Sequence, residues 1–223
     1  MKKSIIKKIF IKLCKIMGYE IIDQNNFTSP TLNKELNEDL SILNTKSIVL
    51  PLGEIKISRK ITSMLILFRT NSNIEIWDQN KKRLFEEPKI EYTIRSLNSL
   101  IKSINFCKKK YPSIKINLII VDDGSSDENL NKIKNLTNGI DFKIDITNLN
   151  HEKYKKIIKA QKSKQTFSNL ASLLCCFEFA KDHGEDLVFF VEDDYLHFTP
   201  MLEEMVSSFE RISSQINKDI FMC

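Results

Sequence analysis

Two short apolar segments of this chain each run directly into a cluster of acidic residues. Residues 116–127 read INLIIVDDGSSD, and residues 186–195 read DLVFFVEDDY. Such short runs of Ile, Val, Leu and Phe are typical of strands that are buried on both faces. A buried strand does not itself need carboxylates, and open α/β sheets bind ligands in the crevice outside the carboxyl ends of their strands. The two segments therefore predict a polar ligand site at one edge of a parallel sheet.

The order of the predicted elements indicates an α/β fold with a mainly parallel, Rossmann-like sheet and helices on both of its faces. We predict strands at 64–68, 116–121, 142–146 and 187–191, and helices at 91–109, 128–136, 167–181 and 201–212. Arg69 and Thr70 directly follow the first strand. Strands and helices alternate along this part of the chain, which is the pattern that parallel pairing requires.

The chain has 223 residues, of which 42% are hydrophobic and 28% are charged, as in soluble globular proteins. This length favours one main domain with an extension. We predict a basic amphipathic helix at 1–18, a polar extension at 19–61 with a short strand at 47–50, and the α/β domain at 62–223.

The N-terminal segment 2–17 has apolar residues on one helical face and most of its lysines on the opposite face. Gly18 is expected to end this helix. A basic amphipathic helix can lie in the surface of an anionic membrane. The alternative is a helix that docks on the body with its lysines in water. We expect a cytoplasmic protein, and the inner face of the cell membrane is the surface that this helix would contact.

The positive charge of the chain is concentrated at the same end. Residues 1–17 contain six lysines and no acidic residue, whereas the other basic residues nearly balance the 29 acidic ones. The formal charge of +5 therefore predicts no nucleic-acid binding by the main domain. The five cysteines are odd in number and lack CxxC spacing, which argues against a metal knuckle or a disulfide framework and fits reduced thiols.

The first acidic cluster, Asp122-Asp123-Gly124-Ser125-Ser126-Asp127, combines a turn with a helix start. Gly124 permits the turn, and Ser125, Ser126 or Asp127 can cap the next helix, a role that we assign to Asp127. Capping does not explain two aspartates before the glycine. Acidic residues at such strand ends accept hydrogen bonds from ribose hydroxyls, so Asp122 and Asp123 are candidates for contact with a nucleoside.

The second acidic cluster is Glu192-Asp193-Asp194. Because strand side chains alternate, Glu192 and Asp194 are expected on one side of the strand and Asp193 on the other. A pair of carboxylates spaced in this way can hold Mn²⁺ or Mg²⁺, hard cations that often bridge to substrate phosphates. His197 follows three residues after Asp194; it is a further possible ligand, but the simpler interpretation is a loop histidine that binds nothing.

The order of these motifs resembles the nucleotide-sugar-binding half of family-2 glycosyltransferases, which have the GT-A fold. In that family a first strand ends near a Thr, a second ends in a DDGS-D motif and a fourth ends in a DxD-type acidic motif. Arg69-Thr70, the cluster that begins at Asp122 and the cluster that begins at Glu192 match these three positions. The resemblance covers about residues 62–212.

The resemblance implies transfer of a sugar from a nucleotide-diphosphate donor, usually UDP-linked, to a glycan or lipid-linked acceptor. Asp194, with Glu192, would bind Mn²⁺ or Mg²⁺ at the diphosphate. Other polar residues would form the nucleotide-sugar site: Arg69, Thr70, Asp122, Asp123, Asn169 and Asp193.

The chain departs from the family pattern at three places. Glu192 replaces the first acid of DxD. Ser168-Asn169 stands where the family often has Arg-Asn, so Lys162 or Lys164 would have to supply the phosphate contact. Only a short stretch follows Asp194, whereas the family's acceptor site and catalytic base lie largely in that later region. We therefore expect an incomplete acceptor half and assign no catalytic residue.

Three other functions compete with this interpretation. A non-catalytic nucleotide-sugar-binding or scaffold protein would keep the donor half alone. A nucleotidyltransferase has a similar sheet, but the chain shows no Gly-rich, Lys/Arg-containing signature after the first strand. A phosphoacceptor receiver domain carries its acidic pair on the first strand, whereas here the pair follows the second.

Overall fold

The computed structural model describes residues 5–19, 21, 56–73, 87–159 and 163–222. These residues belong to two compact units, Met1–Lys56 and Ile57–Cys223, which are described separately. The strand predicted at 47–50 lies outside the described residues, as does Lys162.

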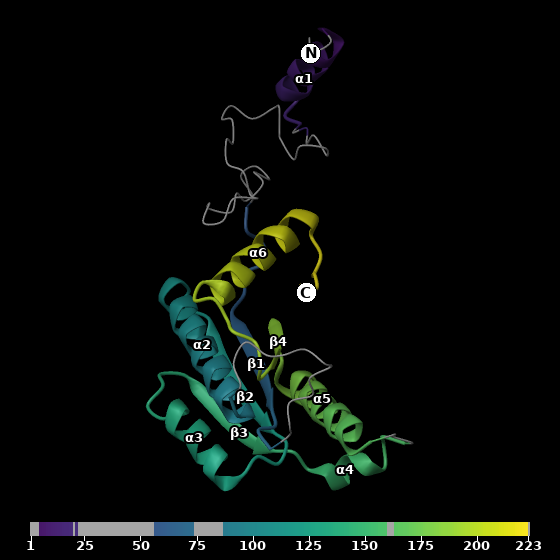
Figure 1. The fold of residues 1–223 in the computed structure, drawn as a ribbon. Coiled ribbons are helices and arrows are strands. Elements are labelled where there is room, and N and C mark those ends of the chain that lie inside the picture. The colour runs from purple at the N-terminus through teal and green to yellow at the C-terminus, as the bar shows by residue number, and fades with distance from the viewer. Residues whose placement is uncertain (1–4, 20, 22–55, 74–86, 160–162, 223) are drawn as a thin grey trace. The chain divides into compact units, whose positions relative to one another are not determined.

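The second unit is built on one parallel sheet of four strands (Figure 1). The strands are β1 (Ser63–Thr70), β2 (Lys115–Asp122), β3 (Lys143–Asn148) and β4 (Leu187–Glu192). Their order across the sheet is β3-β2-β1-β4, and each neighbouring pair is parallel. The four predicted strands and the Rossmann-like α/β fold class are thus confirmed.

Helices cover both faces of this sheet, as predicted (Figure 1). One face packs against α2 (Lys89–Lys110), α3 (Asp127–Thr137) and α6 (Met201–Ile216). The other face packs against α4 (His151–Lys155) and α5 (Lys164–His183). In β1 the alternation of side chains divides the core, since Ile66 and Phe68 face the first group of helices and Leu65 and Leu67 face the second.

The helix α4 is absent from the prediction. It has only five residues, and the side chain of Asn150 caps it by accepting a hydrogen bond from the backbone N–H of Lys153 at 3.4 Å. Tyr154 is buried within the core between α5 and the sheet, and its hydroxyl donates to Glu178 at 2.5 Å. Tertiary packing therefore supports this helix, which is too short to show a helical period in the sequence.

The start of α3 corrects the capping assignment. Ser126 is the N-cap residue, and its Oγ accepts a hydrogen bond from the N–H of Asn129 at 3.3 Å. Asp127, which we expected to be the cap, is the exposed first residue of the helix. Serine and aspartate both favour the N-cap position. The conformation of the turn that begins at Gly124 (φ +78°) therefore decides that Ser126, and not Asp127, caps the helix.

The segment before β1 is joined to α6 and to the start of β4. The N–H of Ile61 donates to Glu210 Oε1 at 2.8 Å, and the N–H and hydroxyl of Thr62 both donate to Asp186. The two Thr62 donors favour the ionised form of the Asp186 carboxyl, and they hold its pKa below the usual value.

In the first unit, α1 covers Ile5–Ile16. Gly18, with φ of +78°, ends the helix as predicted, and the N–H of Tyr19 donates to the carbonyl of Cys14 at 2.8 Å. Across the described part of the chain, no helix combines the length and the apolar character that crossing a bilayer requires.

Candidate functional site

The acidic motifs meet at the carboxyl edge of the sheet. Thr70 is the register partner of Asp122, and Arg69 is the register partner of Glu192, so the ends of β2, β1 and β4 lie side by side. The chain proceeds from β1 outward to β2 and β3, and then returns to place β4 on the other side of β1. A reversal of this kind is where open α/β sheets bind ligands.

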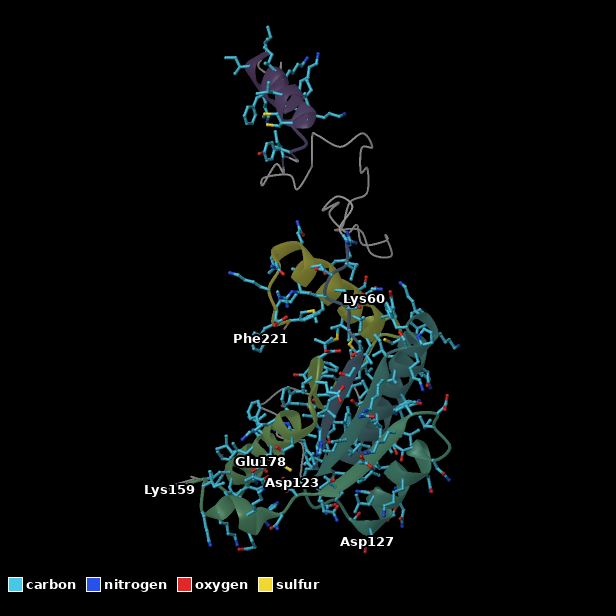
Figure 2. All side chains as sticks on the ribbon, turned by 180° about the vertical axis from the view of Figure 1, so that it is seen from behind. Lys60, Asp123, Asp127, Lys159, Glu178 and Phe221 are labelled. Carbon is cyan, nitrogen blue, oxygen red and sulfur yellow. The ribbon has the colours of Figure 1, made fainter. Side chains whose placement is uncertain are left out.

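Figure 2 shows the same arrangement from behind: Asp123 lies toward the end of the body that carries Asp127, and Lys60 lies at the opposite end. Lys60 precedes β1, whereas Asp123 follows β2, so the two residues mark the amino and carboxyl edges of the sheet.

Asp193 is the most highly connected acid of the second cluster. Its Oδ2 accepts hydrogen bonds from the hydroxyls of Thr70 at 2.8 Å and Thr93 at 2.9 Å, and from the N–H of Asn71 at 3.3 Å. Its Oδ1 lies 2.6 Å from Nζ of Lys89. Asp193 is buried, so these four donors together compensate a carboxylate that has left water.

Arg69 forms a second polar junction on the α5 side of the sheet. Its Nη1 donates to Oδ1 of Asn169 at 2.9 Å and to Oγ of Ser172 at 3.2 Å, and its Nη2 pairs with Glu192. The guanidinium thus links the end of β1 to α5 and to the end of β4. Glu192 and Asp193 lie on opposite faces of the sheet, as strand alternation requires.

Asp123 is buried between α4 and α5. Its Oδ1 lies 2.5 Å from Nε2 of His151, and its Oδ2 accepts a hydrogen bond from Ser168. The imidazole of His151 also contacts the ring of Phe167 edge to face, with centroids 5.8 Å apart. Asp123 therefore holds together the two helices that flank this side of the site.

Asp122 is almost fully buried, with 1% of its surface exposed, but only half of its carboxylate is hydrogen-bonded. Its Oδ2 accepts from the N–H of Ser125 at 3.0 Å, whereas its Oδ1 is buried and has no donor among the described residues. Burial raises the pKa of Asp122 above its ordinary value, against the lowering effect of the Ser125 hydrogen bonds, and the nearby charge of Asp123 raises it further.

The loop after β1 is tied to the loop after β2. Ser72 N–H donates to Oγ of Ser125 at 3.0 Å, and the side-chain amide of Asn73 donates to the carbonyl of Gly124 at 2.6 Å. Asn129, in the first turn of α3, also donates to the hydroxyl of Ser72 at 2.9 Å. These contacts fix the backbone of the turn that carries Asp122.

Asp194 differs from the buried Asp122, Asp123 and Asp193 because 43% of its side chain is exposed. One of its carboxylate oxygens lies 3.9 Å from Nζ of Lys89. Within the described ranges, no group of three or more His, Cys, Asp or Glu side chains is arranged to hold a metal ion. Any cation at this edge would therefore need ligands from a bound molecule or from water in addition to Asp194 and Glu192.

His197 is packed into the body. Its backbone N–H donates to Oγ of Ser99 in α2 at 2.9 Å, and its ring lies against Phe189 of β4 with centroids 6.5 Å apart. Its Nε2 is buried without a hydrogen-bond partner among the described residues, and burial lowers the pKa of the imidazole. These contacts anchor His197 against α2 and β4.

Four residues of the site are missed by the sequence interpretation: Lys89, Thr93, His151 and Ser168. Lys89 and Thr93 lie one turn apart at the start of α2 and therefore share one face of the helix. A basic and a hydroxyl residue with this spacing, in the helix that follows β1, could have been considered as partners for an acid at the strand ends. His151 is isolated in the sequence, and nothing local connects it to Asp123. Ser168 is noted only as a departure from the Arg-Asn pattern.

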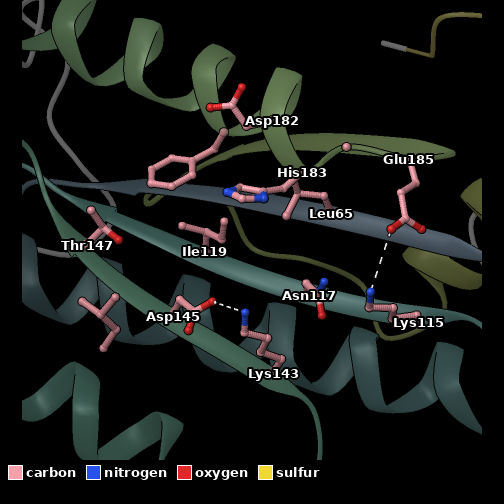
Figure 3. Close-up of a pocket in the computed structure, with 13 residues that line it drawn as sticks. Leu65, Lys115, Asn117, Ile119, Lys143, Asp145, Thr147, Asp182, His183 and Glu185 are labelled. Atoms are coloured by element: carbon pink, nitrogen blue, oxygen red, sulfur yellow. Dashed lines mark ion pairs between the residues drawn. The ribbon is translucent and has the colours of Figure 1, made fainter.

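A separate pocket of about 570 Å³ opens at the other end of the strands, on the α5 face (Figure 3). Lys115 and Lys143, the first residues of β2 and β3, line it together with Asp145, His183 and Glu185. The two lysines are paired with Glu185 at 3.9 Å and with Asp145 at 3.0 Å, respectively. This pocket shares no residue with the site at the carboxyl edge.

Comparison with known proteins adds no family assignment, since no protein-family model and no curated protein matches the chain. The fold and the site therefore define an α/β protein with a polar, largely buried acidic cluster at the switch point of a parallel sheet.

Proposed function

We propose that this protein binds a nucleotide-diphosphate sugar at the carboxyl edge of β1, β2 and β4, and that it acts as a glycosyltransferase. The observation that carries the proposal is the buried Oδ1 of Asp122, which has no donor among the described residues. Buried polar atoms in native proteins are nearly always hydrogen-bonded, so an orphan acceptor at a strand end favours a ligand that brings its own donor.

The chemistry of Asp122 selects the kind of ligand. An ionised carboxylate only accepts hydrogen bonds, so the ligand group must carry N–H or O–H. The ring N–H of uracil or guanine and the hydroxyls of ribose meet this condition.

The second acidic cluster supports the diphosphate part of the proposal. Asp194 keeps an exposed carboxylate, while Glu192 pairs with Arg69 and Asp193 is enclosed by protein donors. Mg²⁺ is usually held by one or two carboxylates together with substrate phosphates, and the exposed Asp194 can supply one such carboxylate; Glu192 could join it only by leaving Arg69. A bound Mn²⁺ or Mg²⁺ would stabilise the negative charge of the departing nucleoside diphosphate.

Lys89 adds a fixed positive charge to this edge. Its Nζ lies 2.6 Å from Asp193 and 3.9 Å from Asp194, so it stands between the buried and the exposed acid. In this position it links the start of α2 to the end of β4. The arrangement supports a role for Lys89 in positioning Asp194.

A second candidate is a nucleotide-sugar-binding protein without transfer activity. It is favoured by the same contacts, because Arg69 already engages Glu192, and Lys89 lies 2.6 Å from Asp193 and 3.9 Å from Asp194, so all three acids already have a basic partner within the protein. Donor binding is common to both candidates, and turnover separates them.

The test measures thermal unfolding of the full chain with UDP- and GDP-sugars, with and without Mn²⁺. A ligand at 100 times its Kd stabilises the native state by about 2.7 kcal/mol, which raises Tm by about 5–10 °C in a chain of this size. We expect this increase with one donor class, and we expect Asp122→Asn to abolish it. In Asp194→Asn the metal-dependent part alone should disappear.

Asp127→Asn is the matched control, since Asp127 belongs to the same acidic segment but is exposed at the start of α3. It should retain the full increase in Tm. Release of free nucleoside diphosphate would then identify an enzyme. If no nucleotide raises Tm with Mn²⁺ present, both candidates are wrong.

A further inference from the structure

The helix α1 has an amphipathic surface that the donor-site proposal does not use. At about 100° per residue, seven of the eight large apolar residues of α1 and the residue after it fall within an arc of roughly 140°. These residues are Ile5, Ile6, Ile9, Phe10, Leu13, Ile16 and Met17. Lys7, Lys8, Lys12 and Lys15 fall in the opposite arc, together with Ile11.

The apolar arc is exposed. Its seven side chains show between 52% and 78% of their surface, which is far more than such residues show in a folded core. A contiguous apolar face of this kind on a soluble protein marks an interaction surface.

The charge of the segment indicates what the surface meets. Residues 1–17 contain six lysines and no acidic residue, whereas helices that pack on other helices usually carry both signs at the border of the contact. Lysines of one sign beside a large apolar face complement anionic lipid headgroups above an acyl layer.

The length of the helix agrees with a position along the membrane surface. Twelve residues extend about 18 Å, whereas a bilayer core is about 30 Å thick, so α1 is too short to cross it. Lysine stems can reach from the side of such a helix to the headgroups while the apolar face is immersed.

We propose that α1 binds the surface of an anionic phospholipid bilayer, with Ile5, Ile9, Phe10, Leu13 and Ile16 immersed and the lysines at the headgroups. This function is independent of the donor site. It attaches the chain to a membrane through one amphipathic helix and a cluster of positive charge.

The test is flotation of the full chain with vesicles of phosphatidylcholine alone and with 30% phosphatidylglycerol, a composition of about one anionic lipid in three, chosen to give a negative surface. We expect binding to the anionic vesicles, and we expect it to weaken as salt rises because exposed charges are screened. Phe10→Glu should reduce the partition coefficient by about tenfold or more, since burial of a phenylalanine is lost.

A second variant distinguishes loss of membrane contacts from unfolding of α1. Lys8→Glu with Lys12→Glu keeps good helix formers, and it should reduce binding by at least about fivefold for each lysine lost near the surface. The matched controls lie in the second unit: Phe198→Glu for the apolar change, and Lys109→Glu with Lys134→Glu for the charge change. All three control positions are exposed, and neither control should alter binding.

Two outcomes would overturn the proposal. One is that the full chain fails to float with anionic vesicles. The other is that the α1 variants leave vesicle binding unchanged but convert a dimer to a monomer in light scattering, which would identify a second copy of the chain as the occupant of this face.

Discussion

Nζ of Lys89 at the start of α2 lies 2.6 Å from Oδ1 of Asp193 at the end of β4, and both side chains are largely buried. This ion pair connects a helix on one face of the sheet to the strand end that carries the second acidic cluster. The hydroxyls of Thr70 and Thr93 complete the environment of Asp193. The shape of the candidate site thus depends on a carboxylate that is itself enclosed by protein groups.

Removing either side chain of the Lys89–Asp193 ion pair should destabilise the native protein. A buried charge that loses its partner typically destabilises a protein by about 3–5 kcal/mol, so we expect Asp193→Ala to lower the free energy of unfolding by that amount. Urea denaturation measures the change. Lys143→Met is the control, because the Lys143–Asp145 pair is exposed and should contribute less than about 1 kcal/mol. Equal effects at the two positions would contradict the proposed role of Asp193.

Asp122 should make stability fall as pH rises above the ordinary pKa of an aspartate. Because burial raises its pKa in the folded state, the native protein holds this proton more tightly than the unfolded chain does. The unfavourable contribution therefore develops from about pH 4 up to the raised pKa, and it remains at neutral pH. Asp122→Asn cannot ionise, so its stability relative to the parent chain should be higher at pH 7 than at pH 4.

Urea denaturation of both proteins at the two pH values tests this expectation. Asp127→Asn serves as the control from the same segment, since Asp127 is exposed. A difference between Asp122→Asn and the parent chain that stays constant with pH would show that Asp122 is not desolvated in the native protein.

His197 should affect stability in the opposite direction, so that stability falls as the pH is lowered. Burial lowers its pKa, so the folded state disfavours the imidazolium, and acidification below the ordinary histidine value of about 6.5 favours the unfolded chain. Stability should therefore be fully present above that value and should decrease toward pH 5. We expect His197→Phe to flatten this part of the profile, as measured by urea denaturation of both proteins between about pH 5 and pH 8. NMR titration of the imidazole checks the direction of the shift independently.

The capping assignment gives a local prediction. Ser126→Ala removes the side chain that accepts from the N–H of Asn129, and loss of an N-cap costs about 1 kcal/mol. Asp127→Ala removes a charge in the first turn and should cost less, about 0.3–1 kcal/mol, with a smaller effect at high salt. Thermal unfolding of the two variants in low and high salt separates them. A larger effect at Asp127 would restore the original assignment.

Several features follow from local pattern. The strands β1, β2 and β4 are runs of large apolar residues, and β3 alternates apolar with polar residues. The helix α2 repeats its apolar residues at Ile94, Leu97, Ile101 and Ile104 with a helical period. The end of α1 at Gly18 follows from the freedom of glycine at positive φ. These properties depend on neighbours in the sequence, so the sequence contains the necessary information.

The contacts of the acidic residues depend on segments that are distant in the chain. The sequence predicts that Asp122, Asp123 and Asp194 lie at one edge of the sheet, but not that His151 and Ser168 enclose Asp123, or that Lys89 and Thr93 enclose Asp193. Each of these partners comes from another element, and its distance is set by the packing of helices on the sheet. The sequence by itself thus determined the fold class and the edge at which the polar residues gather. Only the tertiary structure decided which carboxylates are satisfied within the protein and which oxygen, Oδ1 of Asp122, lacks a donor among the described residues.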